Sequence, residues 1–499
     1  MSFTTQIFIF VFFPLCIFVY YFALFLESKT CFSKIIKKIR LSDLSLICIS
    51  FCFYAWAIFE DLFRFIIYIL LVYILGIIIQ RIRDKKIYLV TEYLESDNSV
   101  KKKHYISPAF FVLCLAIIIF VSVLIHFKYE VFFVRIWNFL ARDSLVGKSI
   151  IAPLGISFIT FSAISYLADI YMGKSSVGSI IDCALYLSFF PKVVSGPIVL
   201  WRDFSKQITE RRVTVELITN GINRIMIGFC KKLILADTFG FCIASSTGNI
   251  DVPTAWLFSL LYMMQLYYDF SGYSDIAIGL SNLFGFTFKE NFNFPYLSLS
   301  ISELWRRWHI SLGSWFREYI YFPLGGSKYG VRKTNINVGI VFLLTGIWHG
   351  VGFAYVLWGL TNGICIMFEK LIQNHNWYQK IPRFVKWMLT MCITFFCWIP
   401  FRFGSISKTV QWVKNMFFDV GIESYTWRYY LDTRMSVLLV ISIIGATILG
   451  LPIVRRIYEH LVQNKVYYVF QQIFLFILFC VAILFMVNST YSPFIYFQY

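Results

Sequence analysis

Two of the six histidines in this chain stand where an imidazole could carry out chemistry. His349 follows Trp348 near the end of an apolar run, where an ionisable side chain is costly and therefore indicates a function. Glycines at positions 346, 350 and 352 would let a second backbone or a substrate approach it closely. We expect His349 to act as a general base toward a hydroxyl, with Trp348 in the surrounding layer. A packed histidine hydrogen-bonded to a neighbouring helix is the structural alternative.

The second candidate, His309, lies in a segment rich in aromatic and basic residues. A continuous helix there would place four apolar side chains on one face: Trp305, Trp308, Leu312 and Trp315. A helix at the membrane interface with an aromatic belt accounts for this pattern as well as a catalytic role does.

Arginines surround the second histidine on both sides. Glu303 could pair with Arg306 or Arg307 one helical turn later. In another interpretation Arg306, Arg307 and Arg317 bind the phosphates of an acyl donor such as coenzyme A, because guanidinium groups bind phosphate well.

Two aspartates, Asp269 and Asp275, interrupt an otherwise apolar segment from 256 to 284. Six residues apart on a helix they point in different directions, which argues against a carboxylate pair in acid–base catalysis. We expect each aspartate to orient a histidine or to hold an arginine in the layer around the site.

Other familiar chemistries leave no trace in the sequence. It has no Gly-rich phosphate loop and no G-x-S-x-G elbow, and its twelve cysteines, without a C-x-x-C pair, are typical of small buried hydrophobes. We therefore expect no metal and no bound cofactor. An intramembrane histidine beside a basic aromatic segment best suits acyl transfer.

The composition places these residues in a membrane. The chain has 499 residues, of which 59% are hydrophobic and 14% charged, and its formal net charge is +18. On a soluble protein that charge would favour nucleic acid, but here it falls in short tracts that are typical of membrane loops: 34–40, 81–86, 101–103, 211–212 and 231–232. We therefore expect an integral membrane protein and no nucleic-acid binding.

At roughly 20 residues per span, the apolar segments predict an all-α polytopic protein with about 11–13 transmembrane or re-entrant helices. The basic tract after the first helix predicts an outside N-terminus. We expect one membrane domain over 1–499. The predicted spans lie near 6–27, 41–59, 61–81, 106–127, 150–172, 178–199, 217–245, 253–285, 335–354, 355–373, 386–404, 436–455 and 466–488.

The segment 286–333 is irregular and polar although it lies between apolar helices. Such backbone persists at membrane depth only when it is buried in protein or lines a wet cavity. This segment is therefore the first candidate for the site.

Four motifs resemble the membrane-bound O-acyltransferase (MBOAT) family, and in particular its bacterial branch with the alginate and peptidoglycan O-acetyltransferase membrane subunits. They occur in family order over residues 189 to 350: Phe189 to Ile198, Asp269 to Asp275, Trp305 to Gly326, and Trp348-His349-Gly350. The motif-bearing core is 150–373. Upstream of residue 150 the likeness is one of hydropathy only.

The resemblance implies that His349 is the catalytic histidine and His309 a second functional histidine. It implies a ring of helices around a central funnel, with the acyl donor entering from the cytoplasm. Acetyl-CoA or another acyl thioester would be the donor, and a secreted or membrane-anchored acetyltransferase would deliver the acetyl group to an extracellular or cell-wall polysaccharide. D-alanyl transfer to teichoic acid, and a proton-coupled transporter or flippase that uses Asp269, Asp275 and His349, remain alternatives.

The C-terminal segment 489–499 is unusual, because four of its last six residues are aromatic. We expect it to dock into an apolar site, most simply the outer funnel of the same protein, and it resembles the tail of the polysaccharide-acetylating branch. There the phenol of Tyr496 could attack the donor thioester and carry the acyl group. Tyr499 as acceptor and simple aromatic anchoring remain alternatives.

Overall fold

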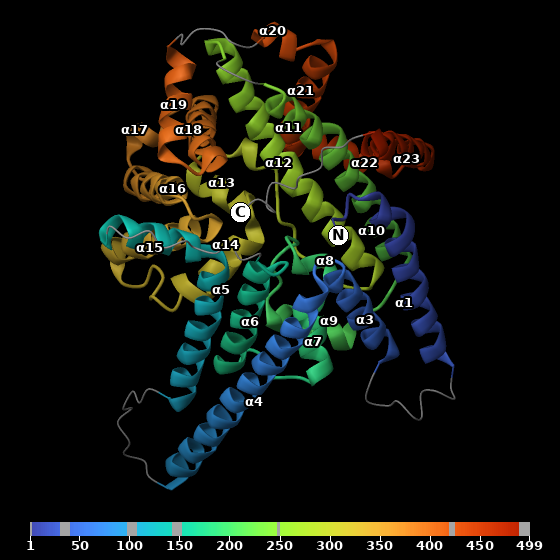
Figure 1. The fold of residues 1–499 in the computed structure, drawn as a ribbon, viewed down its shortest axis with the longest axis vertical. Coiled ribbons are helices and arrows are strands. Elements are labelled where there is room, and N and C mark those ends of the chain that lie inside the picture. Colours follow the sequence, from blue (N-terminus) through green and yellow to red (C-terminus); the bar gives the residue numbers. More distant parts are fainter. Residues whose placement is uncertain are drawn as a thin grey trace. The chain divides into compact units, whose positions relative to one another are not determined.

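In the computed structural model, residues 2–29, 40–96, 107–141, 152–246, 250–418 and 425–488 are described. This part of the chain is helical and contains no β-strand. It divides into two compact units (Figure 1): an N-terminal unit of Met1–Ile218 with Ser281–Phe288, and a C-terminal unit of Thr219–Leu280 with Lys289–Tyr499.

In the N-terminal unit, α4 packs against α5 and α6, and α3 packs against α1 and α7. The helices of this unit are η1 (Phe8–Phe12), α1 (Phe13–Ser28), α3 (Leu41–Ala55), α4 (Phe59–Ser96), α5 (Pro108–Ala141), α6 (Ile156–Tyr171), α7 (Ile180–Ser188), α8 (Phe190–Val193) and α9 (Trp201–Glu210).

The C-terminal unit carries both candidate histidines. Its helices, the first of which begins at the boundary between the units, are α10 (Val215–Phe229), η2 (Cys230–Ala236), α11 (Asp237–Ala244), α12 (Val252–Leu283), η3 (Pro295–Leu297), α13 (Ile301–Arg307), α14 (Ile310–Phe316), η4 (Arg317–Tyr321), α15 (Gly330–His349), α16 (Phe353–Ile372), α17 (Asn376–Gln379), α18 (Arg383–Phe403), α19 (Ile406–Phe417), α20 (Trp427–Tyr430), α21 (Thr433–Ala446), η5 (Ile448–Gly450), α22 (Pro452–Val462) and α23 (Lys465–Asn488).

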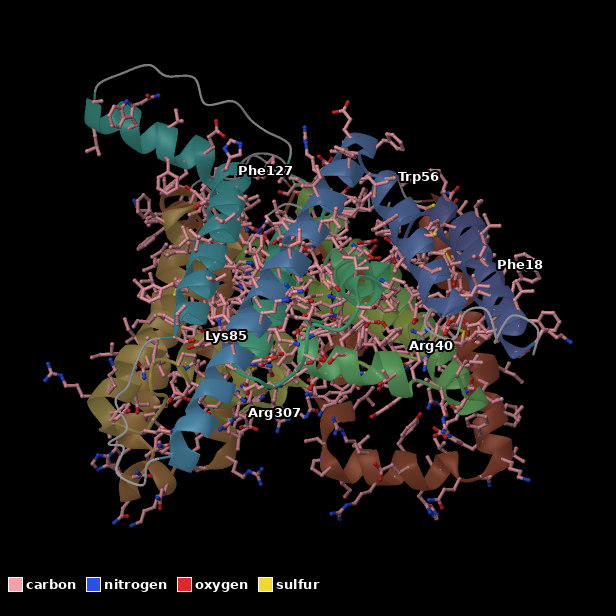
Figure 2. The ribbon with its side chains drawn as sticks, turned by 90° about the horizontal axis from the view of Figure 1, so that it is seen from below. Phe18, Arg40, Trp56, Lys85, Phe127 and Arg307 are labelled. Carbon is pink, nitrogen blue, oxygen red and sulfur yellow. The ribbon has the colours of Figure 1, made fainter. Side chains whose placement is uncertain are left out.

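Seven helices within the described residues are long and apolar enough to span a membrane: Phe8–Ser28, Phe59–Lys85, Pro108–Glu130, Phe353–Ile372, Arg383–Phe403, Thr433–Gly450 and Lys465–Asn488. Their outer faces are apolar, and Figure 2 draws Phe18 of α1 pointing outward with 67% of its surface exposed. Lipid tails, unlike water, solvate such side chains favourably. The protein is an all-α polytopic membrane protein.

Several predicted spans differ from this set for local reasons. Helices α3 and α6 are apolar but have only 15 and 16 residues, fewer than the roughly 20 that cross a bilayer. The continuous span predicted over 178–199 is wrong, because α7 ends at Ser188, α8 is a single turn, and residues 194–200 are not helical.

Helices α10 and α12 approach each other closely along a seam of glycines. A Cβ atom on Gly228 would lie 2.6 Å from the carbonyl oxygen of Gly272, and one on Gly279 would lie 2.6 Å from that of Gly221. Real Cβ contacts are never that short. The seven-residue spacing of the glycines on both helices therefore keeps their backbones in contact over two helical turns.

Lysines of η2, which follows α10 directly, bind aspartates of α11 and α12. Lys232 is buried, and its ammonium group lies 2.7 Å from Asp269 and 2.5 Å from Asp237. The assignment of Lys231 and Lys232 to a tract typical of membrane loops is therefore wrong, whereas the helix predicted near 217–245, which contains both, is present from α10 to α11. The sequence does not distinguish a buried lysine inside a helix from a lysine in a loop, because the carboxylate partner that stabilises the buried lysine is not adjacent in the pattern.

Candidate active site

His349 is the last residue of α15, and three helices surround its buried ring. The ring centroid lies 5.0 Å from that of Trp358 on α16, at 88°, and 5.1 Å from that of Phe401 on α18, at 76°. Both contacts are edge-to-face, the geometry that aromatic quadrupoles favour. The imidazole is therefore held in one orientation by packing from two neighbouring helices.

Glycines bring α15 and α16 together behind His349. A Cβ on Gly346 would lie 2.5 Å from the carbonyl oxygen of Tyr355, and one on Gly359 would lie 2.4 Å from that of Phe342. The close approach of a second backbone that the glycine spacing predicts is therefore present. It places Trp358 against the imidazole.

His309 occupies a break between two helices. Its φ angle is +46°, which is rare for a residue other than glycine, and it separates α13 from α14. The single continuous helix considered from the sequence is therefore wrong here. The break turns the His309 ring inward, where it lies 4.6 Å from the ring of Phe270 at 88°.

Asn291 holds His309 in this conformation. Its backbone carbonyl accepts a hydrogen bond from the N–H of Ile310 at 3.0 Å, and its side-chain oxygen accepts from the N–H of Ser311 at 3.2 Å. The same side-chain oxygen lies 3.1 Å from Nδ1 of His309. The amide group donates to Ser274 at 3.1 Å.

These contacts define the tautomer of His309. An amide oxygen accepts hydrogen bonds and cannot donate them, so Nδ1 carries the proton and Nε2 carries the lone pair. Burial lowers the pKa of His309 to about 3, which keeps the ring neutral at physiological pH. Its Nε2 can therefore accept a hydrogen bond from a reacting group.

Trp348 connects the two histidines. Its ring centroid lies 4.7 Å from that of His349 and 6.4 Å from that of His309. Both imidazoles therefore lie beside one indole, inside the same unit of the protein. The structure brings together the three residues that the sequence analysis selected from motifs about forty positions apart.

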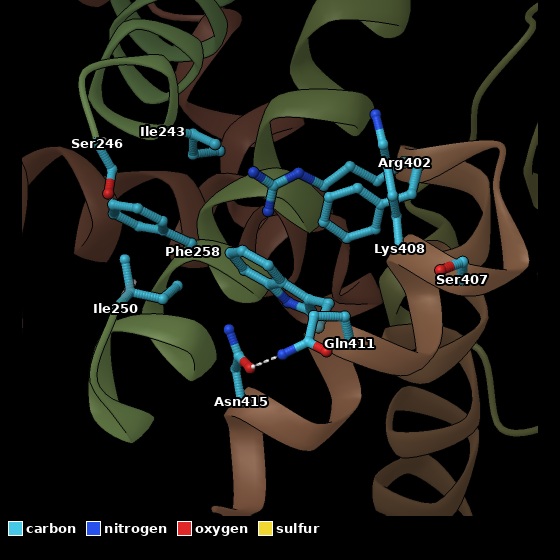
Figure 3. Close-up of a pocket in the computed structure, with 11 residues that line it drawn as sticks. Ile243, Ser246, Ile250, Phe258, Arg402, Ser407, Lys408, Gln411 and Asn415 are labelled. Carbon is cyan, nitrogen blue, oxygen red and sulfur yellow. Dashed lines mark hydrogen bonds between the residues drawn. The ribbon is translucent and has the colours of Figure 1, made fainter. Parts of the chain in front are cut away.

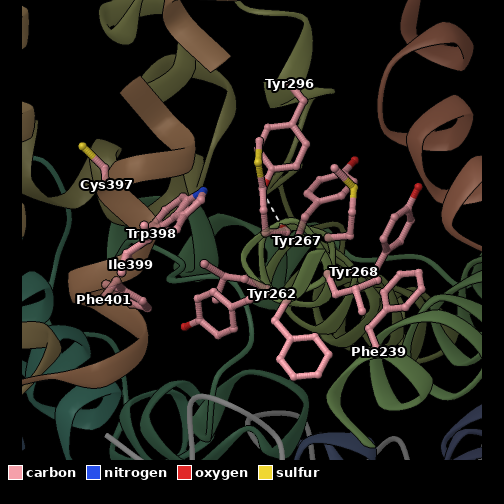
Figure 4. Packing of buried hydrophobic residues seen from close by; sticks show 14 of the residues in the cluster. Phe239, Tyr262, Tyr267, Tyr268, Tyr296, Cys397, Trp398, Ile399 and Phe401 are labelled. Atoms are coloured by element: carbon pink, nitrogen blue, oxygen red, sulfur yellow. Dashed lines mark hydrogen bonds between the residues drawn. The ribbon is translucent and has the colours of Figure 1, made fainter. Parts of the chain in front are cut away.

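Four further tryptophans fill the space around this group. Trp308 lies 4.8 Å from Trp398, and Trp305 lies 5.4 Å from Trp358. Figure 4 shows Trp398 and Phe401 on one side of the neighbouring aromatic cluster and the tyrosines of α12 on the other. Aromatic rings thus make up much of the surroundings of both imidazoles, and surroundings of low polarity strengthen electrostatic interactions.

Glu369 fixes the helix before His309. Its carboxylate accepts hydrogen bonds from the N–H groups of Ile301 at 2.5 Å and Ser302 at 2.9 Å, at the N-terminus of α13. A carboxylate at that end satisfies N–H groups that otherwise lack partners and complements the helix dipole. Sequence reasoning missed both Glu369 and Asn291, because neither lies in a motif and each acts across the fold.

The three arginines have different surroundings. Arg307 pairs with Glu303 at 2.7 Å, as the one-turn spacing predicts, and donates to the carbonyl of Asn293 at 3.2 Å. Arg306 and Arg317 are exposed, and within the described part of the chain neither has an ion pair. Binding of a donor's phosphates by these residues stays a prediction.

The aspartates of α12 bind cations. Asp275 accepts hydrogen bonds from Arg224 at 2.7 Å and Lys231 at 2.6 Å, while Asp269 pairs with Lys232. These pairs join α12 to the helix that begins at α10.

Among the described residues, no group of three or more His, Cys, Asp or Glu side chains is placed to hold a metal ion. Tyr496 and Tyr499 lie outside the described residues.

Comparison with known proteins identifies the family of the chain. The family model for the membrane-bound O-acyltransferase family matches residues 2–407. The chain belongs to this family.

Individual relatives carry more specific names. The probable alginate O-acetylase AlgI of Pseudomonas putida is 32% identical over 100% of both chains. AlgI of Pseudomonas aeruginosa is 38% identical over 61% of this chain and 60% of its own length. The peptidoglycan O-acetyltransferase of Helicobacter pylori is 33% identical over 61% of this chain and 64% of its own length. The matched segment thus spans about three fifths of two of these relatives and all of the third.

Proposed function

We propose that the protein is a membrane O-acyltransferase that passes acetyl groups from a cytoplasmic thioester donor across the membrane for O-acetylation of an extracellular or cell-wall polysaccharide. One observation carries the proposal: His309 and His349 flank the ring of Trp348, and Asn291 orients His309 through its Nδ1. The names of the relatives supply the polysaccharide.

The reaction needs a base and an acid at one place. A hydroxyl of the acceptor attacks the thioester carbonyl, a C–O bond forms, and the C–S bond breaks. His349 takes the hydroxyl proton and returns it to the departing thiolate, so that the ring ends neutral. His309, already neutral and oriented, is placed to accept a hydrogen bond from the acceptor or to assist the same transfer.

Exposed arginines are the residues that we propose bind the acyl donor. Arg306 and Arg317 lie before and after His309 in the chain and are exposed, while Arg307 is already paired with Glu303. Guanidinium groups bind phosphate through paired hydrogen bonds. Acetyl-CoA, with its phosphates, suits such a site.

The alternatives differ in what they require. In D-alanyl transfer the same histidines would act on another thioester, so the donor decides between the two reactions. A proton-coupled transporter needs carboxylates that gain and lose protons. Asp269 and Asp275 are each held by a cation, which suits a structural role in α10 and α12 better than a proton relay.

The decisive experiment uses the full-length protein reconstituted in nanodiscs. Radiolabelled acetyl-CoA is supplied with a polysaccharide acceptor and the purified partner acetyltransferase, and label in the polymer is counted. We expect transfer by the wild type and none by His349→Ala. Transfer of D-alanine but not acetate would support the alternative reaction, and proton flux without acyl transfer would overturn the proposal.

A further inference from the structure

Helix α22 (Pro452–Val462) connects two membrane spans without crossing the membrane itself (Figure 1). The span before it ends at Gly450 and the span after it begins at Lys465, so no more than two residues separate α22 from either span. Its 11 residues rise about 16 Å, roughly half of the hydrocarbon core. Gln471 of the second span also donates a hydrogen bond to the hydroxyl of Tyr458 at 2.7 Å. Held at both ends, α22 therefore lies at one surface of the bilayer.

One face of α22 is apolar and exposed. Ile453, Ile457 and Leu461 recur every fourth residue, which places them along one side of a helix. Exposed fractions of these three side chains are 68%, 55% and 39%. The charged and titratable side chains, which are also exposed, follow the rest of the helix: Arg455, Arg456, Glu459 and His460. A helix with this pattern lies in the membrane interface with its apolar face among the acyl chains.

The polar face of α22 is basic. Arg455 and Arg456, with Lys465 three residues beyond the helix, outnumber the single carboxylate of the helix. Arg456 and Lys465 are exposed. Their surroundings differ from those of Arg402, which lines a cavity of about 450 Å³ with its guanidinium carbon 4.5 Å from the ring centroid of Trp412 (Figure 3). Exposed cations beside an inserted apolar face attract the phosphates of anionic lipids.

Arg455 joins α22 to the segment that precedes α13. Its Nη2 donates a hydrogen bond to Oδ1 of Asn293 at 2.8 Å, and its guanidinium carbon lies 4.7 Å from the ring centroid of Phe294. A Cβ atom on Gly450 would lie 2.4 Å from Cγ of Phe294, so the backbone just before α22 touches the same ring. The start of α22 is therefore packed against this segment through both a side chain and the main chain.

The segment that Arg455 contacts also holds His309. The N–H of Asn293 donates a hydrogen bond to the carbonyl of Arg307 at 2.9 Å. Two residues earlier, the side-chain oxygen of Asn291 lies 3.1 Å from Nδ1 of His309. A continuous series of contacts thus runs from the membrane-surface helix to the orienting partner of an imidazole in the candidate site.

We propose that α22 binds the anionic headgroup layer of the cytoplasmic leaflet. Ile453, Ile457 and Leu461 insert among the acyl chains, and Arg456 and Lys465 bind lipid phosphates. The basic residues favour the cytoplasmic side, where such residues are retained and where anionic lipids give the surface its negative potential. A second copy of the chain is the competing occupant, but the tie of α22 to a span at each end favours lipid.

This binding also has a consequence for the candidate site. Lipid bound to α22 holds the helix at the depth where Arg455 contacts Asn293 and Phe294. A lipid can shift a conformational equilibrium only by its difference in affinity for the two states. The exposed apolar face supplies that difference, because it is solvated favourably only while α22 stays in the interface.

The binding test uses the full-length protein in nanodiscs that contain equal amounts of phosphatidylglycerol and phosphatidylcholine. p-Benzoylphenylalanine replaces Ile457, or Glu459 on the opposite face as the matched control, and mass spectrometry identifies the adducts after irradiation. We expect lipid adducts at position 457 and few at position 459. Phosphatidylglycerol adducts should exceed phosphatidylcholine adducts about 5- to 25-fold, since each basic residue near an anionic surface contributes a factor of about five.

A charge variant identifies the source of this preference. Arg456→Gln should lower the ratio of the two adducts about fivefold. Arg428→Gln removes the same charge from α20, which precedes the other end of α21, and should leave the ratio unchanged. Equal adducts with both lipids, adducts only with a second copy of the protein, or equal effects of Arg456→Gln and Arg428→Gln would overturn the proposal.

Acyl transfer tests the link to His309, and this arm alone rests on the proposed function. The wild type should transfer about fivefold faster in phosphatidylglycerol than in phosphatidylcholine nanodiscs, a typical coupling between two sites. Arg455→Gln should transfer at one rate in both lipids. Asn293→Ala removes the same hydrogen bond from the other side and replaces Arg455→Gln should that variant fold poorly.

The two arms fail separately. Equal stimulation of the wild type and Arg455→Gln by phosphatidylglycerol would overturn the link to His309. Lipid adducts at position 457 of a wild type that transfers no acyl group would contradict the proposed function and support the lipid-binding surface.

Discussion

The side-chain oxygen of Asn291 lies 3.1 Å from Nδ1 of His309 and also accepts the backbone N–H of Ser311. The backbone bond fixes which way the amide faces, and the amide in turn fixes the tautomer of the imidazole. One residue thereby sets both the conformation of the break between α13 and α14 and the proton position on His309. The effect of Asn291 on activity can be separated from its effect on folding by comparing substitutions at this position at equal protein abundance.

Asn291→Ala should lower acyl transfer by between roughly 10- and 10⁴-fold, the upper limit being the loss when the partner that orients a catalytic imidazole is replaced. Asn291→Asp should recover a large part of this activity, because a carboxylate accepts the same Nδ1 hydrogen. Transfer rates are measured with the two variants at equal protein abundance. Asn376→Ala, at an exposed asparagine of α17, serves as the control. Equal loss in the Ala and Asp variants would contradict the positioning role.

His349→Ala should remove roughly 10²- to 10⁴-fold of the transfer rate, because it deletes the general base. The protein should remain inserted in the membrane, since the imidazole is packed by rings that persist without it. His375→Ala changes an exposed histidine and should leave the rate unchanged. Near-normal polymer acetylation by His349→Ala at normal abundance would contradict the assignment of His349 as the general base.

His309→Ala should also reduce acyl transfer. A His309→Ala variant that only lowers protein abundance would instead favour a structural role for His309.

Arg306→Ala should raise the KM for acetyl-CoA in a salt-sensitive way, because exposed charge contacts are screened by ions. Arg307→Ala should have a smaller effect on KM, since Arg307 is already paired with Glu303. The comparison is made between 50 mM and 500 mM salt in the assay, with Arg428→Ala, an exposed arginine of α20, as the control. Identical activity of Arg306→Ala and wild type at limiting donor would exclude a donor contact.

The glycine seam between α10 and α12 gives a prediction about stability. Gly228→Ala would place a Cβ 2.6 Å from the carbonyl of Gly272, so the helices must separate, and we expect a loss of roughly 1–3 kcal/mol. Gly339→Ala, on α15 with nothing within 4 Å, should be neutral or stabilise by up to about 1 kcal/mol through helix propensity. Thermal unfolding in detergent compares the two. A Gly228→Ala protein as stable as Gly339→Ala would show that the seam tolerates separation.

Most of the helices could be predicted from the sequence because each long apolar run has one stable state in a membrane. The segment 178–199 could not, because its helix breaks at Phe189, immediately before the Phe190-Pro191 start of α8, and hydropathy does not register such a break. The positive φ of His309 was equally hidden. It depends on Asn291, eighteen residues earlier, and propensity describes only neighbours in the chain.

The sequence predicts those residues of the candidate site whose polar chemistry is unusual for their apolar surroundings. A histidine at the end of an apolar helix is expensive, so His349 stood out by itself. The residues that orient the catalytic side chains could not be predicted. An asparagine or a glutamate in a sequence has no unusual free-energy cost until the fold buries it. Asn291 and Glu369 are of this kind. The pairing of Lys232 with Asp269 was hidden for the same reason.

The last prediction concerns Tyr496, which lies outside the described residues and rests on the aromatic sequence of the tail alone. If its phenol attacks the donor thioester, the C–S bond breaks, an O-acetyl ester forms on Tyr496, and the phenolic proton passes through His349 to the thiolate. Peptide mass spectrometry of protein incubated with acetyl-CoA should then show one acetyl group on Tyr496 that is absent from His349→Ala. Tyr496→Phe keeps the ring and removes only the hydroxyl, and Tyr499→Phe is its matched control. Full transfer activity in Tyr496→Phe would leave aromatic anchoring as the role of this side chain.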